Sequence, residues 1–108
     1  MTMQKVSAPN MSEVLFAEQL RRAGFAFEQQ YVYAPPRRFR ADFALIHFGL
    51  LIEIQGGIYS RQAHGSVSGV LADIERGNEA ALAGWRVLRF TPDSVADGSA
   101  LAFVLRVL

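Results

Sequence analysis

The feature that most constrains this chain is an acidic residue inside an apolar strand. The segment LLIEIQ, at residues 50–55, is built of Leu and Ile except for Glu53 and Gln55. Because side chains alternate along a strand, these two polar residues share one face, opposite Leu50, Ile52 and Ile54. The preceding segment FRADFALIH, at 39–47, carries Asp42 in the same kind of setting. Burying a lone carboxylate is costly, so the fold has to bring these acids to something that compensates their charge.

The two segments are predicted to form a hairpin, with a short turn near residues 48–49. A turn centred between residues 47 and 48 opposes Asp42 to Glu53, whereas a turn centred between 48 and 49 opposes Asp42 to Gln55. In either register, Asp42 lies beside the Glu53 and Gln55 face, and directly opposed Cβ atoms are about 5 Å apart.

The remaining pattern predicts an α/β fold with a mixed four-stranded sheet flanked by helices. Asn10 and Gly24 bound the first predicted helix as cap and stop, and Ser99 caps the last one. Residues 58–69 are polar and aperiodic, which indicates a surface loop. The other predicted elements are strands at 25–33, 39–47, 50–55 and 85–90 and helices at 71–84 and 101–108, in the order α-β-β-β-α-β-α.

Composition excludes several classes of protein. The 108 residues, 51% of them hydrophobic, suit one domain spanning 1–108 rather than a disordered tail, with residues 1–10 expected to be flexible. The absence of cysteine excludes disulfide scaffolds, thiolate zinc sites and cysteine nucleophiles. No apolar run reaches the roughly 18–20 residues that a membrane span needs, and residues 1–10 lack the apolar core of a secretion signal. We therefore expect a cytoplasmic protein with no membrane contact.

Basic residues are almost all arginine. Of the 11 basic residues only Lys5 is lysine, and Arg37, Arg38 and Arg40 fall within four positions. A planar guanidinium suits phosphate better than an ammonium does, so the cluster is typical of a nucleic-acid contact. Codon bias in a GC-rich genome is the alternative explanation for the excess of arginine.

Neighbouring carboxylates on one sheet face favour a metal site. Asp42 and Glu53 repel each other, and a partly hydrated divalent cation such as Mg²⁺ removes that conflict. Glu13 is a candidate third carboxylate, because it shares a helical stripe with apolar residues expected to face the sheet. The alternative is a set of structural ion pairs, in which Asp42 contacts Arg40 or Arg76 and Glu53 contacts another arginine.

These residues also carry a family resemblance. The stretch RADFAL…LLIEIQGG resembles the motif of the PD-(D/E)XK nuclease superfamily, and the predicted element order is similar to its restriction-endonuclease-like core. The longer pattern E-x-x-G-G…H…G…D-x-x-K/R-x-N-x-A…G-W-x-V-L-R resembles small phage and prophage nucleases. The similarity runs from about Glu13 to Pro92.

The resemblance implies a role for each matched residue. Asp42 and Glu53 become metal ligands together with the backbone carbonyl of Ile54, and Glu13 matches an acidic residue on the first helix of many members. Gln55 stands where the superfamily has a lysine that positions or activates the attacking water. An amide orients water but provides neither a base nor a positive charge.

The cation missing at that position has a candidate replacement in Arg76 on the next helix, where related phage nucleases have lysine or arginine. A surface pair between Asp73 and Arg76 is the alternative for this residue. His64 either contacts a phosphate or is an ordinary surface histidine. Ala41, in place of the superfamily's proline, is a tolerated departure.

The expected function is therefore a Mg²⁺-dependent DNA endonuclease, with Mn²⁺ as a substitute ion and no organic cofactor. Arg37, Arg38, Arg40, His64 and Arg76 are the expected DNA contacts. Two alternatives stay open, namely a catalytically inactive DNA-binding module of the same fold and a structural interaction protein. One protomer of this size covers little duplex, so a homodimer with two active sites is a further hypothesis.

Overall fold

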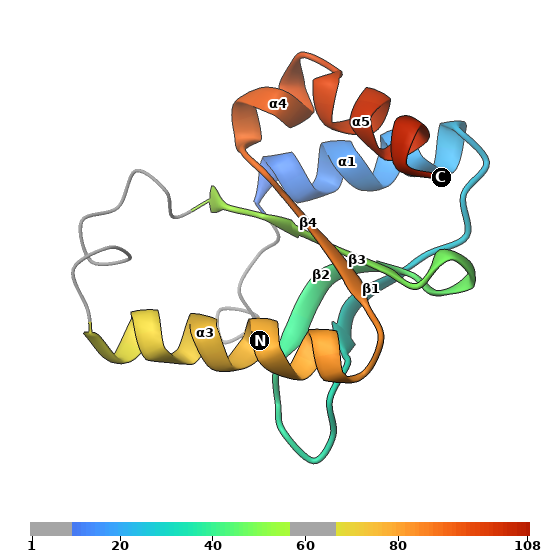
Figure 1. The fold of residues 1–108 in the computed structure, drawn as a ribbon. Helices are drawn as coiled ribbons and strands as arrows, with labels where there is room; N and C mark the ends of the chain where they lie inside the picture. Colours follow the sequence, from blue (N-terminus) through green and yellow to red (C-terminus); the bar gives the residue numbers. More distant parts are fainter. Residues whose placement is uncertain (1–9, 57–66) are drawn as a thin grey trace, which may run out of the picture.

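The computed structural model describes residues 10–56 and 67–108 (Figure 1). Residues 1–9, most of the segment expected to be flexible, and His64 lie outside this described part. In chain order the elements are α1 (Met11–Arg22), β1 (Glu28–Val32), β2 (Arg40–Leu45), η2 (Ile46–Phe48), β3 (Leu50–Ile54), α3 (Val67–Leu82), β4 (Arg86–Phe90), α4 (Pro92–Ala96) and α5 (Ser99–Val107). The predicted element order is confirmed, with η2 and α4 as additional short helices.

The sheet is mixed and has the strand order β1-β2-β3-β4. The first three strands are antiparallel, and β4 returns parallel to β3 after the α3 crossover. Phe43 pairs with Ile52 and Leu45 with Leu50, which is the register centred between residues 47 and 48. The α/β class is confirmed, and so is the first of the two predicted hairpin registers.

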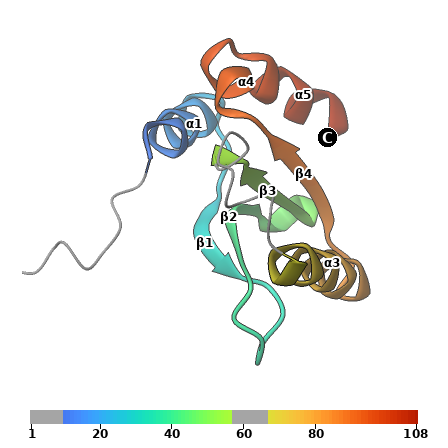
Figure 2. The same cartoon turned by 90° about the vertical axis from the view of Figure 1, so that its left-hand side faces the viewer.

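Helices cover both faces of this sheet. α1, α4 and α5 lie on one face and α3 lies on the other, as two perpendicular views show (Figures 1 and 2). The larger core cluster is on the α1 side; its buried members are Phe16, Ala17, Leu20, Phe43, Leu45, Leu50, Ile52, Ile54, Val95, Ala100 and Val104. The smaller cluster, on the α3 side, consists of Tyr33, Ala41, Ala44, Leu51 and Ala80.

Local signals fix the ends of α1 as predicted. The Asn10 side chain accepts a hydrogen bond from the Glu13 N–H at 2.9 Å, which satisfies one of the free donors at the helix N-terminus. Gly24 follows the helix with φ of +87°, a left-handed conformation that glycine adopts without steric cost.

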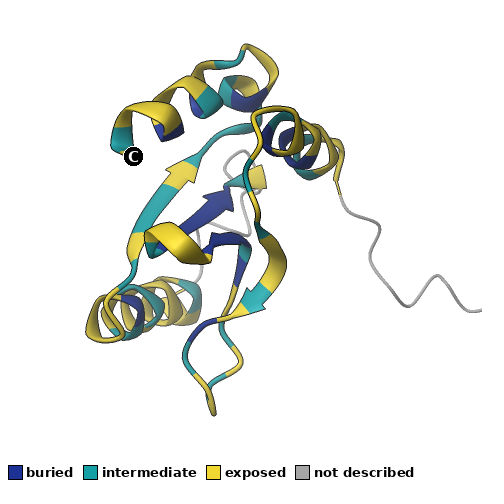
Figure 3. Ribbon diagram, turned by 90° about the vertical axis from the view of Figure 1, so that its right-hand side faces the viewer, coloured by how far each residue is buried: buried dark blue, intermediate teal, exposed yellow. Residues whose placement is uncertain are grey.

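Two helix predictions need correction. α3 begins at Val67 rather than Leu71, and its apolar positions Leu71, Ile74 and Leu82 are each more than half exposed. Figure 3 shows that most of this helix is exposed. Its buried residue is Ala80, because the helix touches the sheet mainly near its C-terminal end. Ser99 is the first residue of α5 rather than its cap. Within the described residues, no helix has both the length and the apolar character needed to cross a bilayer.

The α1-side core rests on Phe16. Its side chain is fully buried and meets Phe43 edge to face with ring centroids 5.4 Å apart. We expect Phe16→Ala to lower the free energy of unfolding by about 3–5 kcal/mol, through lost burial and a residual cavity. Leu15→Ala, at a 40% exposed neighbouring position, is the matched control and should cost less than about 1 kcal/mol. Equal losses in urea unfolding would contradict this packing.

Candidate functional site

The site begins where β2 and β3 separate. Their paired residues end at Phe43 and Ile52, although both strands continue. Beyond that point the Ile54 N–H donates to Oδ2 of Asp42 at 2.7 Å. A side-chain carboxylate thus takes the place of a strand carbonyl, which holds Asp42 in the gap between the two strands.

An irregularity in β1 and β2 aims Asp42 into that gap. Ala41 and Ala44 belong to the same α3-side cluster, whereas in a regular strand they would point to opposite faces. Across the ladder from Asp42, Gln30 has φ of +51°. A left-handed non-glycine residue is strained, and such residues concentrate at functional sites.

Glu53 is the one buried charged residue in the described part of the chain. Its Oε2 accepts a hydrogen bond from Nη2 of Arg76 at 2.8 Å. Its Oε1 lies 3.6 Å from Nε of Arg89 and 3.4 Å from Nε2 of Gln55. Two guanidinium groups therefore neutralise this buried carboxylate, and the amide of Gln55 borders the same oxygen as Arg89.

Two further carboxylates, those of Glu13 and Asp42, have no arginine ion pair among the described residues. Nε2 of Gln30 lies 3.4 Å from Oε1 of Glu13 and 3.4 Å from Oδ1 of Asp42, so one amide bridges both acids. Burial raises the pKa of Glu13, and the negative charge of Asp42 raises it further. Burial also raises the pKa of Asp42, and the charge of Glu53 adds to this shift. The Ile54 N–H, the Gln30 amide and the charge of Arg76 oppose it.

The site is therefore electrically polarised. On the α1 side, the polar partners of the Glu13 and Asp42 carboxylates among the described residues are the Gln30 amide, the Asn10 amide and the Ile54 N–H. On the α3 side, one carboxylate faces two guanidinium groups. A place that attracts a cation lies directly beside a place that attracts an anion.

The structure places two of the three predicted acids, Glu13 and Asp42, on the same Gln30 amide, and Glu53 lies close enough to Asp42 for its charge to raise the pKa of Asp42. The ion-pair alternative describes Glu53, but it was wrong for Asp42, which has no arginine partner among the described residues. The expected surface pair of Arg76 with Asp73 was also wrong, because Arg76 turns toward the sheet. There it meets Glu53 and donates to the Arg40 carbonyl at 3.0 Å.

The arginine cluster in the β1–β2 connection is only partly free. Arg37 pairs with Glu75 at 2.6 Å and stacks 4.4 Å from the centre of the Phe39 ring. Arg38 is exposed and has no ion pair or hydrogen bond within residues 10–56 and 67–108. Its guanidinium is therefore more accessible to an external anion than that of Arg37.

The donor set has the chemistry of a hard cation site. In the described residues, no three His, Asp or Glu side chains form a cluster that could hold a metal ion. Asp42 and Glu53 nevertheless offer two carboxylates on either side of the Ile54 peptide group. Mg²⁺ accepts one or two carboxylates and completes its shell with water, so these residues fit it. Glu53 would then give up or share a guanidinium contact.

Two residues of the site, Gln30 and Arg89, were missing from the sequence prediction. Gln29, rather than Gln30, interrupts the aromatic alternation of FAFEQQYVY, so the sequence pattern does not single out Gln30. Arg89 lies in the apolar run WRVLRF and is the parallel partner of Glu53. Its role depends on which strand lies beside β3, which the sequence pattern alone does not specify.

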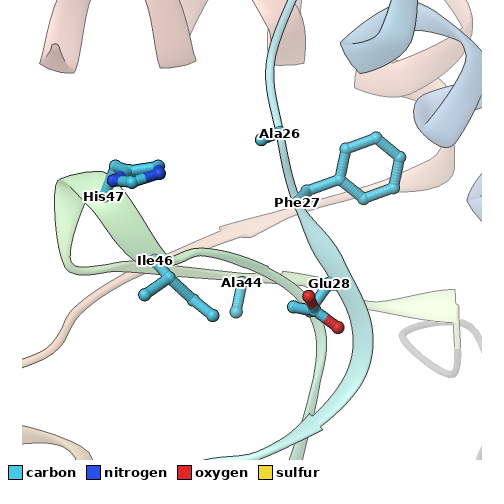
Figure 4. Close-up of a pocket in the computed structure, with 6 residues that line it drawn as sticks. All are labelled: Ala26, Phe27, Glu28, Ala44, Ile46 and His47. Carbon is cyan, nitrogen blue, oxygen red and sulfur yellow. The ribbon is translucent and has the colours of Figure 1, made fainter.

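A small pocket of about 200 Å³ lies elsewhere, beside β1 and η2 (Figure 4). Its lining residues are Ala26, Phe27, Glu28, Ala44, Ile46 and His47. None of the predicted site residues lines it. The acidic and basic groups described above are a surface feature around the end of β3 rather than a pocket.

Comparison with known proteins establishes the fold. No protein-family model matches this chain, and no curated protein matches it in sequence. Among solved structures, it is similar to the catalytic domain of the homing endonuclease I-Bth0305I, with a TM-score of 0.66 and 19% sequence identity. The match covers 91% of this chain and 92% of that domain. The chain therefore has the fold of that nuclease domain over nearly its whole length.

The raised pKa of Asp42 predicts that this residue lowers stability. Asp42→Asn keeps an oxygen to accept the Ile54 N–H and removes a partly buried charge, so we expect about 0.5–2 kcal/mol of stabilisation at pH 7. A carboxyl whose pKa is higher in the folded state destabilises the fold when ionised. The gain should therefore vanish as the pH falls below the unfolded-state pKa. Thermal melting in EDTA measures it, with the exposed Asp73→Asn as control. A loss of stability at pH 7 would contradict this electrostatic account.

Proposed function

We propose that this chain is a metal-dependent DNA endonuclease of the PD-(D/E)XK type. The observation that carries the proposal is the acidic pair Glu13 and Asp42 beside Glu53 with its two guanidinium groups, all around the end of β3. Metal-dependent hydrolysis of a phosphodiester uses a cation-binding group next to groups that bind the phosphate. The similarity in fold to a homing endonuclease catalytic domain supports the same function.

Asp42, Glu53 and the Ile54 carbonyl are the proposed ligands of Mg²⁺, or of Mn²⁺ in its place. A bound divalent ion lowers the pKa of a coordinated water and takes up charge on a phosphoryl oxygen. The hydrogen bond from the Ile54 N–H fixes the Asp42 carboxylate, so this ligand needs little reorganisation. Gln30 restrains Glu13 and Asp42 from the side of β1.

The usual lysine has two proposed replacements. The Gln55 amide lies beside Glu53 and orients the attacking water, since it can both donate and accept a hydrogen bond. Arg76 supplies the positive charge from α3, where it is already hydrogen-bonded to Glu53. No side chain in this arrangement needs to act as a base if the water is activated by the ion.

The DNA backbone is the proposed partner of the β1–β2 connection. Arg38 is exposed in this connection and Arg40 is exposed at the start of β2, and Arg37 becomes available if its pair with Glu75 opens. Contacts of arginine with phosphate position a duplex without reading its sequence.

A second candidate function is a DNA-binding module without hydrolysis. The hydrogen bond from Arg76 and the contact with Arg89 favour it, because they occupy both oxygens of Glu53. The same DNA surface is kept in this case, so the two functions differ only in cleavage.

A cleavage assay separates the two functions. We expect the chain to cut plasmid or branched DNA with Mg²⁺ or Mn²⁺ and to stop in EDTA. Glu53→Gln should lower the cleavage rate by more than the roughly 10–100-fold that loss of an outer-shell group costs, because it removes a ligand. DNA affinity measured in EDTA should be retained. Glu18→Gln, on the exposed side of α1, is the control. DNA binding with no cleavage under any divalent ion would favour the inactive module.

The DNA contact predicts a difference between two adjacent arginines. Arg38→Ala should lower the slope of log affinity against log salt by about 0.9, the effect of one lost phosphate contact. Arg37→Ala should change the slope less, because Glu75 already neutralises Arg37. Anisotropy titrations of a labelled duplex from 50 to 200 mM salt, roughly the range over which such contacts weaken, measure both slopes. Equal slopes for Arg38→Ala and the unaltered chain would remove Arg38 from the interface.

A further inference from the structure

We propose that Arg89 binds a DNA phosphate at the active site, whereas Arg76 serves as the fixed partner of Glu53. The inference rests on the proposed function and deepens it by dividing the two guanidinium groups between two tasks. The division follows from how differently the two side chains are held.

Arg76 is anchored on several sides. Its side chain is 24% exposed, and Nη2 donates to Glu53 at 2.8 Å and to the Arg40 carbonyl at 3.0 Å. The guanidinium also lies 5.6 Å from the centre of the Phe39 ring. Moving it toward a ligand would break all three contacts, so Arg76 is built to stay in place.

Among the described residues, the Arg89 guanidinium has one contact, which is looser. Its side chain is 46% exposed, and its Nε is 3.6 Å from Glu53, too far for a hydrogen bond. Its two Nη groups have no partner among the residues that the structure describes. A guanidinium carries five N–H donors, so most of those of Arg89 remain available to an acceptor from outside.

The backbone of Arg89 is nevertheless fixed beside the reacting centre. β4 pairs with β3 so that Arg89 is the direct partner of Glu53, and the Gln55 N–H donates to the Phe90 carbonyl at 2.7 Å. This backbone pairing brings a half-exposed cation next to the proposed metal ligand. The hydrogen bond from Arg76 already satisfies Oε2 of Glu53, and a phosphate offers Arg89 a geometry that the planar guanidinium matches.

The test measures DNA binding without catalysis. Affinity of the full chain for a labelled duplex is followed in EDTA across a salt series for Arg89→Gln, Arg89→Lys and Arg76→Gln, with melting temperatures for each. Arg106→Gln is the matched control, since Arg106 is exposed on α5, on the other side of the sheet. We expect Arg89→Gln to weaken binding about tenfold or more and to lower the salt slope by about 0.9, with melting unchanged. Arg89→Lys should restore the slope, and Arg76→Gln should lower the melting temperature.

Two results would overturn the proposal. One is a wild-type salt slope in Arg89→Gln, and the other is a fall in its melting temperature equal to that of Arg76→Gln, which would make Arg89 a structural partner. The proposed function is judged separately by cleavage. If the chain cuts DNA and its Arg89→Gln variant binds with the wild-type salt slope, the proposed function is supported and the inference about Arg89 is contradicted. If the chain never cuts DNA but its Arg89→Gln variant binds with a reduced salt slope, the inference about Arg89 is supported and the proposed function is contradicted.

Discussion

The hydrogen bond from the Ile54 N–H to the Asp42 carboxylate is the interaction on which the site depends. It closes the β2–β3 ladder with a charged side chain instead of a backbone carbonyl, at the point where the paired residues end. The strands separate there, and Asp42 and Glu53 come near each other without direct contact. The cost of this arrangement is visible in Gln30, which adopts a left-handed conformation across from Asp42. The strained backbone of Gln30 and the buried charge of Glu53 both lie at this end of the sheet, and apolar packing does not explain either of them.

The same corner also holds α3 in place. This helix buries only Ala80 among its described residues, so apolar packing secures one end of it. Polar contacts secure its middle, through the pair of Arg76 with Glu53 and the pair of Arg37 with Glu75. Exposed pairs are worth about 0–1 kcal/mol, whereas removing one partner of a buried pair costs more because a buried charge is left alone. The position of α3 and the charge state of the site are therefore coupled.

Much of the fold follows from local sequence signals, whereas the site follows only in part. Apolar alternation and turn residues predict the strands, and the short turn restricts the hairpin to two registers, one of which the structure has. That register brings Asp42 and Glu53 together as predicted. The sequence alone does not identify Arg89 as a partner of Glu53. Arg89 is distant in sequence and lies next to Glu53 only because β4 pairs in parallel with β3. The role of Gln30 depends on a backbone conformation that no residue preference predicts.

The central claim is that Asp42 and Glu53 hold a divalent cation beside the Ile54 peptide. A crystal soaked in Mn²⁺ and measured at the manganese absorption edge tests it directly. The account predicts an anomalous peak about 2.0–2.2 Å from a carboxylate oxygen of each residue, with Arg89 moved away from Glu53. A crystal that shows no peak there, with Arg76 and Arg89 both still on Glu53, would contradict it.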